Sequence, residues 1–338
     1  MDLNHIFLFL ALISPLLVLA RTLRPGGPHR GWRIAALIVL GVTALTWICA
    51  PRIAGYAGGL AWMFLLFLPA IGLRKVTEFA ERGDYRAARI LGTILQPLHP
   101  SDGLRRQLQL FRHLESEAAK RPRAVFARLP HGQVQKLRRA PAVMTLILLN
   151  IAAFVFEISA GDWTDPGVLR RVGALDPYAV VERGEYWRLF SALFLHGGIA
   201  HLGFNLFALY VLGPPLERAI GSLRFVICYV ISGLASSAGV VALTVLGLVD
   251  VDLLVGASGC IMGVVGAWAG FWIRHRSAPQ ARQQIGNVLL IVAIQTAFDL
   301  STPQVSLSAH VGGLIAGFFL GLILAPTRQV KSTEHRNG

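Results

Sequence analysis

Gly256-Ala257-Ser258-Gly259, followed by the apolar and small residues from Cys260 to Trp272, is the stretch that decides the fold. It predicts a helix in lipid with Ser258 in its first turn. Backbone N–H groups at a helix start have no partner within the helix and carry partial positive charge, so an anion forming beside Ser258 would meet donors there. Gly256 and Gly259 carry no side chain that would block its approach. Ser258 is therefore a candidate nucleophile.

A base for this serine is found farther along the chain. His310 lies in the apolar stretch Ser308-Ala309-His310-Val311-Gly312-Gly313, and small residues recur after it at Gly313, Gly317 and Gly321. Small residues at this spacing let two membrane helices touch closely. The two stretches together predict a nucleophile and a base on packed helices inside a membrane.

The composition is that of a polytopic membrane protein. Of the 338 residues, 54% are hydrophobic and only 15% are charged, which is too apolar for an ordinary soluble protein. The net charge of +14 would suit a nucleic-acid binder, but Arg and Lys lie between apolar runs and on alternate sides of them, as the positive-inside rule describes. We therefore expect no nucleic-acid partner. The three cysteines all lie in apolar runs, and no Cys/His spacing resembles a zinc site, so we expect no disulfide framework, metal or cofactor.

Nine apolar runs, each near the roughly 20 residues that a helix needs to cross hydrocarbon, predict nine transmembrane helices. The loop at 161–187 is acidic and is expected outside, whereas the arginine-bearing loops and the tail are expected in the cytoplasm. The N-terminus then lies outside and the C-terminus inside. The runs are 3–20, 34–50, 56–73, 142–160, 189–213, 224–248, 256–273, 286–300 and 305–325.

These runs and the charges between them predict four parts. Residues 1–73 form a three-helix transmembrane extension, 74–140 a basic cytoplasmic insert, 141–326 a six-helix core and 327–338 a cytoplasmic tail. The insert holds fifteen Lys or Arg against six Asp or Glu. Apolar residues at helical spacing in 75–96 and 103–118 predict a helical hairpin within the insert. It would lie near anionic lipid headgroups or bind an unidentified partner.

Polar residues in the fifth run point to further parts of a site. His201 and Asn205 are four residues apart, so they share one helix face, and both can donate hydrogen bonds to an oxyanion. His196 should point elsewhere and hold the preceding loop. The alternative for each residue is an ordinary interhelical hydrogen bond, worth about 1 kcal/mol. No acid is evident to hold His310, because Asp299, eleven residues upstream, is expected to cap a helix end or hold a loop.

Together these pieces resemble the rhomboid family of intramembrane serine proteases. The resemblance covers about residues 140–326 and leaves the first 139 residues unaccounted for. The pieces that carry it, with their order and spacing, are Trp187-Arg188, His196 with His201 and Asn205, Glu217-Arg218 with Gly221-Ser222, Gly256-Ala257-Ser258-Gly259, and Ala309-His310 followed by Gly312-Gly313.

The resemblance implies an all-α membrane fold and a Ser258–His310 catalytic dyad. It also implies help for the oxyanion and substrate from His201, Asn205 and the Gly256–Ser258 backbone, and structural support from Trp187, Arg188 and His196. One position departs from the family pattern. Four residues after the nucleophile, where rhomboids often have an aromatic residue beneath the imidazole, this chain has Met262.

The leading functional hypothesis is an endopeptidase that cuts single-span membrane proteins near the outer membrane face. The alternative is a non-catalytic rhomboid-like protein that binds membrane helices, which loss of Ser258 or His310 would favour. A proton-coupled transporter would show two related halves, and no such repeat is seen. The N-terminus is not an Arg-rich amphipathic segment, so we expect a bacterial inner membrane rather than mitochondrial import.

Overall fold

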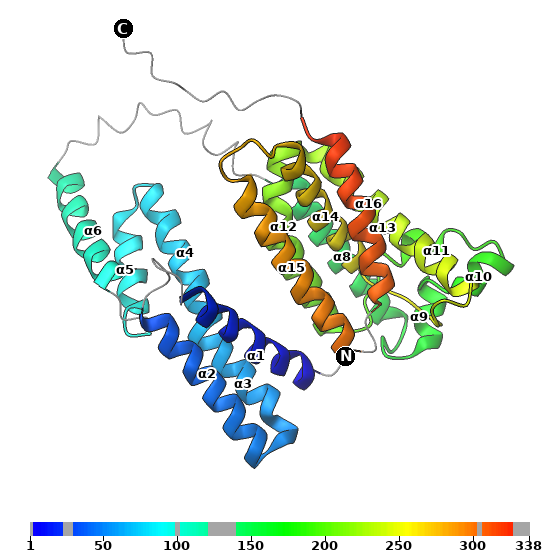
Figure 1. Cartoon of the computed structure of the whole chain (residues 1–338), viewed down its shortest axis with the longest axis horizontal. Coiled ribbons are helices and arrows are strands. Elements are labelled where there is room, and N and C mark those ends of the chain that lie inside the picture. Colours follow the sequence, from blue (N-terminus) through cyan, green and yellow to red (C-terminus); the bar gives the residue numbers. More distant parts are fainter. Residues whose placement is uncertain (1–2, 23–29, 99–101, 121–139, 303–305, 327–338) are drawn as a thin grey trace, which may run out of the picture. The chain divides into compact units, whose positions relative to one another are not determined.

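A computed structural model describes residues 3–22, 30–98, 102–120, 140–302 and 306–326. The chain divides into two compact units, Met1–Pro130 and His131–Gly338, and each is described by itself. The described residues are almost entirely helical (Figure 1), and their one isolated β-bridge joins Leu175 to Leu254. The predicted all-α class is confirmed.

The membrane part of the first unit is a three-helix bundle. Its core contains Ala11, Ala35, Val39 and Leu66. The helices are α1 (Leu3–Thr22), α2 (Arg30–Cys49) and one continuous helical stretch made of η1 (Pro51–Ile53), α3 (Ala54–Trp62), η2 (Met63–Phe67) and α4 (Leu68–Glu81). Because α4 runs on to Glu81, no helix end separates 1–73 from 74–140.

The insert differs from the predicted hairpin. The sequence suggested one helix over 75–96, but the chain turns at Gly83, whose φ is +76°. Asp84 then caps a new helix by accepting from the Ala87 N–H at 3.0 Å. The insert therefore contains the end of α4, then α5 (Tyr85–Leu95) and α6 (Asp102–Lys120), which share a small apolar core. Gly83 thus ends α4, and the side chain of Asp84 caps the start of α5.

The described residues of the second unit form six long helices and a folded loop. The loop contains the short helices α9 (Pro166–Val172), α10 (Pro177–Glu182) and α11 (Arg188–Ser191). The predicted run at 189–213 was wrong at its start, because the long helix begins only at Ile199 and continues to Ile220. The long helices are α8 (Pro141–Ala160), α12 (Ile199–Ile220), α13 (Ser222–Val245), α14 (Ser258–Arg274), α15 (Ala281–Ser301) and α16 (Leu307–Leu324).

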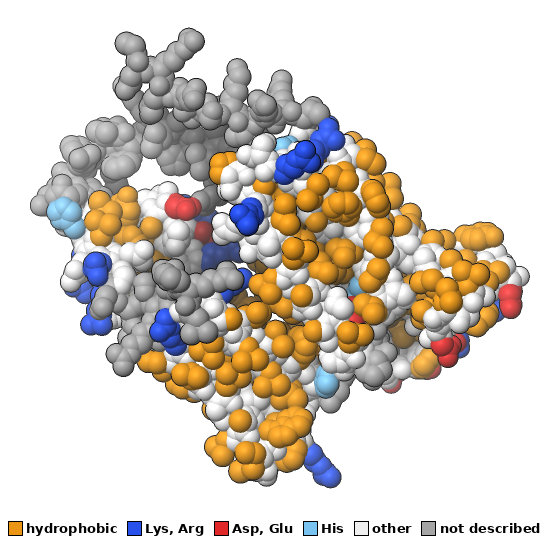
Figure 2. Space-filling view, viewed as in Figure 1, with side chains coloured by type: hydrophobic (Ala, Val, Ile, Leu, Met, Phe, Trp, Pro, Cys, Tyr) orange, Lys and Arg blue, Asp and Glu red, His pale blue; other side chains and the backbone are white. Residues whose placement is uncertain are grey.

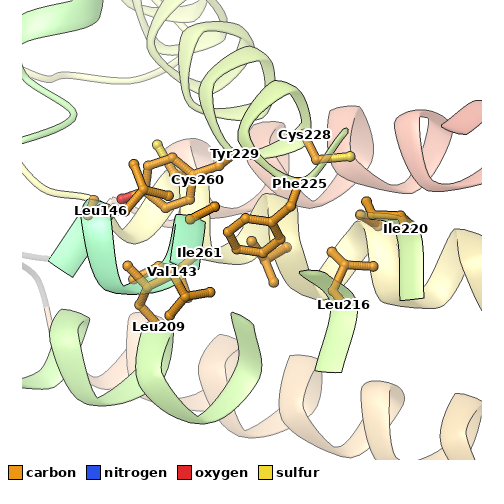
Figure 3. Packing of buried hydrophobic residues seen from close by; sticks show 14 of the residues in the cluster. Val143, Leu146, Leu209, Leu216, Ile220, Phe225, Cys228, Tyr229, Cys260 and Ile261 are labelled. Carbon is orange, nitrogen blue, oxygen red and sulfur yellow. The ribbon is translucent and has the colours of Figure 1, made fainter. Parts of the chain in front are cut away.

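One apolar core joins α8, α12, α13 and α14. Figure 3 shows Val143, Leu209, Phe225 and Ile261 directed toward one another from these four helices. A buried carboxylate fixes one end of this core. Glu217, in the last turns of α12, accepts from the backbone N–H groups of Ala142 and Val143 at 2.9 Å each and from the Ser222 hydroxyl at 2.6 Å. It thus satisfies donors at the starts of both α8 and α13.

The contact between α14 and α16 is made by backbone rather than by side chains. A Cβ added to Gly313 would lie 2.1 Å from the Gly259 carbonyl oxygen, and one added to Gly317 would lie 1.9 Å from that of Gly263. Gly321 meets Ala267 in the same way, at 2.1 Å. The close packing predicted from these glycines is confirmed.

The protein is a multi-pass membrane protein. Eight described helical stretches are long and apolar enough to span a bilayer, and they correspond to eight of the nine predicted runs. The ninth, α14, has 17 residues, or about 25 Å of helix. Apolar side chains cover the flanks of α15 and α16 (Figure 2), where Leu289, Leu300, Ile315, Phe319 and Ile323 are more than half exposed. Such surfaces are suited to lipid.

Candidate active site

Ser258 begins α14, as the sequence predicts. The residue before its helix, Ala257, is buried, whereas Ser258 itself is partly exposed. Gly256 has a φ of +131°, a backbone conformation open to glycine and strained for other residues. The chain therefore turns sharply into the helix and leaves the serine hydroxyl accessible.

Gly256 brings Ser258 and His201 to one place. A Cβ added to Gly256 would lie 2.7 Å from Cε1 and 2.8 Å from Nε2 of His201, and 3.7 Å from the Ser258 hydroxyl oxygen. The Gly256 N–H already donates to the Ala192 carbonyl at 2.9 Å. Gly256 therefore matters because it has no side chain, and its N–H is not free to bind an anion. The backbone donors available to an anion are the unpaired N–H groups at the start of α14.

The first turns of α14 and α16 lie against each other. A Cβ on Gly259, next to Ser258, would lie 3.7 Å from the carbonyl oxygen of Ala309, next to His310. The same Ala309 carbonyl accepts from the Ser236 hydroxyl of α13 at 2.7 Å, which ties three helices together here. His310 is buried at this junction.

An acid does hold His310, so the expectation for Asp299 was wrong. Asp299 Oδ2 lies 2.8 Å from His310 Nδ1, and its Oδ1 accepts from Gln295 Nε2, also at 2.8 Å. Both carboxylate oxygens are therefore used by side chains, and neither caps a helix. Asp299 and Gln295 are one turn apart on α15, whereas His310 is on α16.

His201 and Asn205 stand on one face of α12. Asn205 Nδ2 is a buried amide nitrogen without a hydrogen-bond partner among the described residues. Such a donor costs about 1–3 kcal/mol when it is left unpaired. The centroids of the His196 and His201 rings are 5.3 Å apart and edge to face. The expectation that His196 points away from His201 was wrong.

His196 also fastens the segment ahead of α12. Its backbone N–H donates to Glu157 Oε2 of α8 at 2.8 Å, and its Nδ1 lies 3.0 Å from the Phe194 carbonyl oxygen. Because the carbonyl can only accept, Nδ1 carries the proton. Glu157 is fully buried, so this acid of the first core helix is a structural anchor.

Trp187 and Arg188 organise the long loop. The buried Arg188 donates to the carbonyls of Arg170 at 2.7 Å and Ala174 at 3.0 Å, and it pairs with Glu185. Its guanidinium carbon lies 4.6 Å from the centroid of the Trp187 ring. The hydrogen bond from Arg188, with Arg183 nearby, holds the pKa of Glu185 below its usual value. Arg188 therefore holds the loop together, and Trp187 packs against its guanidinium.

Met262 packs in an apolar cluster with Val265 and Val288, between α14 and α15. The residues that sequence reasoning missed are Asp299 and Gln295 as partners of His310, and Glu157 as the anchor of His196. Each forms a contact with a residue of another segment of the chain, which no spacing within one helix can show. Among the described residues no group of His, Cys, Asp or Glu is arranged to hold a metal ion.

Comparisons with known proteins identify the family. A family model described as a rhomboid domain matches residues 183–327. YdcA of Bacillus subtilis (strain 168) is 30% identical over 149 residues, which span 72% of its length. The chain belongs to the rhomboid family. The rhomboid match begins within the loop and includes every helix from α11 to α16.

Other relatives are longer than the shared part. "RHOMBOID-like protein 6, mitochondrial" of Arabidopsis thaliana is 39% identical over 173 residues, which are 50% of this chain and 53% of that protein. "Rhomboid protease GluP" of Bacillus subtilis is 33% identical over 223 residues, which are 63% of this chain and 42% of that protein. The chain thus spans about half the length of these curated rhomboid relatives.

Proposed function

We propose that this rhomboid-family protein is an intramembrane serine endopeptidase with Ser258 as nucleophile and His310 as base. One observation carries the proposal. At Gly256 the Ser258 hydroxyl and the His201 ring approach the same point of the backbone, 3.7 Å and 2.7 Å from where a Cβ would lie. A nucleophile beside a hydrogen-bond donor is part of what acyl transfer needs, and His310 would supply the base.

The reaction follows from these positions. His310 takes the hydroxyl proton as the Ser258 oxygen attacks a peptide carbonyl carbon, and the carbonyl oxygen becomes an anion. The N–H groups at the start of α14, the His201 ring and Asn205 Nδ2 are the donors for that anion. His310 gives the proton to the leaving amine. Water then attacks the acyl-enzyme and loses a proton to His310, which passes it to the Ser258 oxygen as the carboxylic acid leaves.

The substrates that fit this site are single-span membrane proteins. The site lies at the start of α14 and α16, so an extended segment must reach it from one end of the helices rather than from their middle. With the N-terminus outside, that end is the outer face of the membrane. The bacterial inner membrane stays a prediction, because the relatives come from a plant as well as from a bacterium.

The test is cleavage of a reporter transmembrane segment by the full chain in detergent. We expect the parent to cleave this segment, and we expect no cleavage by Ser258→Ala or His310→Ala. Ser301→Ala and His113→Ala are matched controls, because both residues are exposed and lie outside the site, and they should cut at the parental rate. A parent that binds the segment without cutting it would favour the non-catalytic helix binder instead.

A further inference from the structure

Asp299 is a buried acid on a helix that buries little else. Its side chain is only 1% exposed, and that of His310 is 5% exposed. The other buried residues of α15 are the apolar Ala281 and Val288. A lone carboxylate buried within a membrane helix is costly, so Asp299 needs a partner of matching chemistry.

The partner is the imidazole of His310, at 2.8 Å from Nδ1 to Oδ2. Gln295 Nε2 also approaches Nδ1, but at 3.4 Å, and its shorter bond of 2.8 Å goes to Asp299 Oδ1. The distances therefore assign the Nδ1 contact to the carboxylate. A carboxylate accepts hydrogen bonds only, so the proton of neutral His310 lies on Nδ1 and the lone pair lies on Nε2.

We propose that Asp299 is a positioning residue that makes the Ser258–His310 pair a Ser–His–Asp arrangement, with Gln295 holding the carboxylate in place. This inference rests on the proposed function. Asp299 fixes the tautomer in which Nε2 can accept the hydroxyl proton, and it fixes the angle of the ring. No other tautomer of His310 can both bond Asp299 and act as a base through Nε2.

Asp299 also compensates charge during the reaction. When Nε2 takes the proton from Ser258, the ring becomes an imidazolium with its positive charge next to the carboxylate. In a Ser–His–Asp arrangement the Nδ1 proton stays on nitrogen. The proton then leaves Nε2 for the leaving amine, and the charge on the ring disappears. Asp299 thus acts through His310 and does not touch the substrate.

The position of Asp299 also suits the rest of this site. Met262, four residues after Ser258, packs with Val265 and Val288 in an apolar cluster. One restraint on the His310 ring is the hydrogen bond that its Nδ1–H donates to Asp299 of α15. We therefore expect the orientation of the base to depend on α15 in this protein.

The experiment compares Asp299→Asn with the parent and with Asp250→Asn, the same chemical change at an exposed loop acid. We expect kcat of Asp299→Asn to fall at least about tenfold and by as much as about 10⁴-fold, the loss caused by a wrong histidine tautomer in a Ser–His–Asp triad. The KM should stay within about twofold, because Asp299 does not contact substrate. Gln295→Ala should lower kcat less.

A second readout needs no turnover. Proton NMR of the full chain with isotope-labelled histidine should show a downfield Nδ1–H resonance. His310→Ala identifies that resonance, which should persist in Ser258→Ala and disappear in Asp299→Asn. An unchanged kcat in Asp299→Asn, or the absence of this resonance in the parent, overturns the inference. The proposed function is tested separately by Ser258→Ala and His310→Ala. A parent that never cuts overturns both.

Discussion

Gly317 of α16 faces the carbonyl oxygen of Gly263 of α14 so closely that a Cβ at Gly317 would lie 1.9 Å from it. A contact this short leaves room for a hydrogen atom only. Since α14 begins with Ser258 and α16 carries His310, this packing sets how far apart the proposed nucleophile and base are.

Gly317→Ala should therefore destabilise the protein and lower its activity. The added methyl must push two backbones apart, which costs about 2 kcal/mol or more. The measurement is the thermal unfolding midpoint in detergent together with the cleavage rate. Gly286→Ala on α15 is the matched control, because its Cβ would meet nothing within 4 Å and a helical Gly→Ala change stabilises by about 0.5–1 kcal/mol. Equal midpoints for the two variants would contradict the packing argument.

Glu217→Gln should loosen the end of the core where α8 and α13 begin. The carboxylate accepts from two backbone N–H groups and from Ser222, and an amide would turn a donor toward one of them. We expect a loss of about 1–3 kcal/mol of folding stability. Denaturant unfolding measures it, with Glu182→Gln as control because Glu182 is exposed. If both changes cost the same, the buried carboxylate has no special role.

The loop around Arg188 should weaken in acid. Because Arg188 holds the pKa of Glu185 below its usual 4.5, the ion pair contributes its full stability above pH 4.5 and loses it as the pH falls through the lower folded value. Glu185→Gln should therefore lower the unfolding midpoint near neutral pH, and the difference from the parent should vanish in strong acid. A difference that grows as the pH falls would reverse the assigned sign.

Sequence reasoning found the helix contact that small residues announce and missed the contacts that polar side chains make between segments. The glycines of α16 predicted close helix packing because small residues serve that purpose directly. The apolar run from 189 suggested a helix, but Arg188, Ser191 and the Gly197-Gly198 pair belong to a folded loop, and apolar content alone does not separate the two. Asp299 and His310 are eleven residues apart, too far for neighbours on one helix, so only the pairing of α15 with α16 reveals their contact.

Asn205 offers a test of how the proposed oxyanion is held. Its Nδ2 is buried without a partner, so the free protein bears a desolvation cost that a bound anion would relieve. The gain is larger for the charged transition state than for the neutral carbonyl, so Asn205→Ala should lower kcat by about 10²–10³-fold with a smaller change in KM.

The control is Asn287→Ala, since Asn287 is exposed on α15. Steady-state cleavage by both variants gives the two constants, and labelling of Ser258 by a fluorophosphonate separates a damaged nucleophile from a lost anion donor. A rise in KM with kcat unchanged would place Asn205 in substrate binding. That result would leave His201 and the N–H groups at the start of α14 as the donors that distinguish the transition state from the bound peptide.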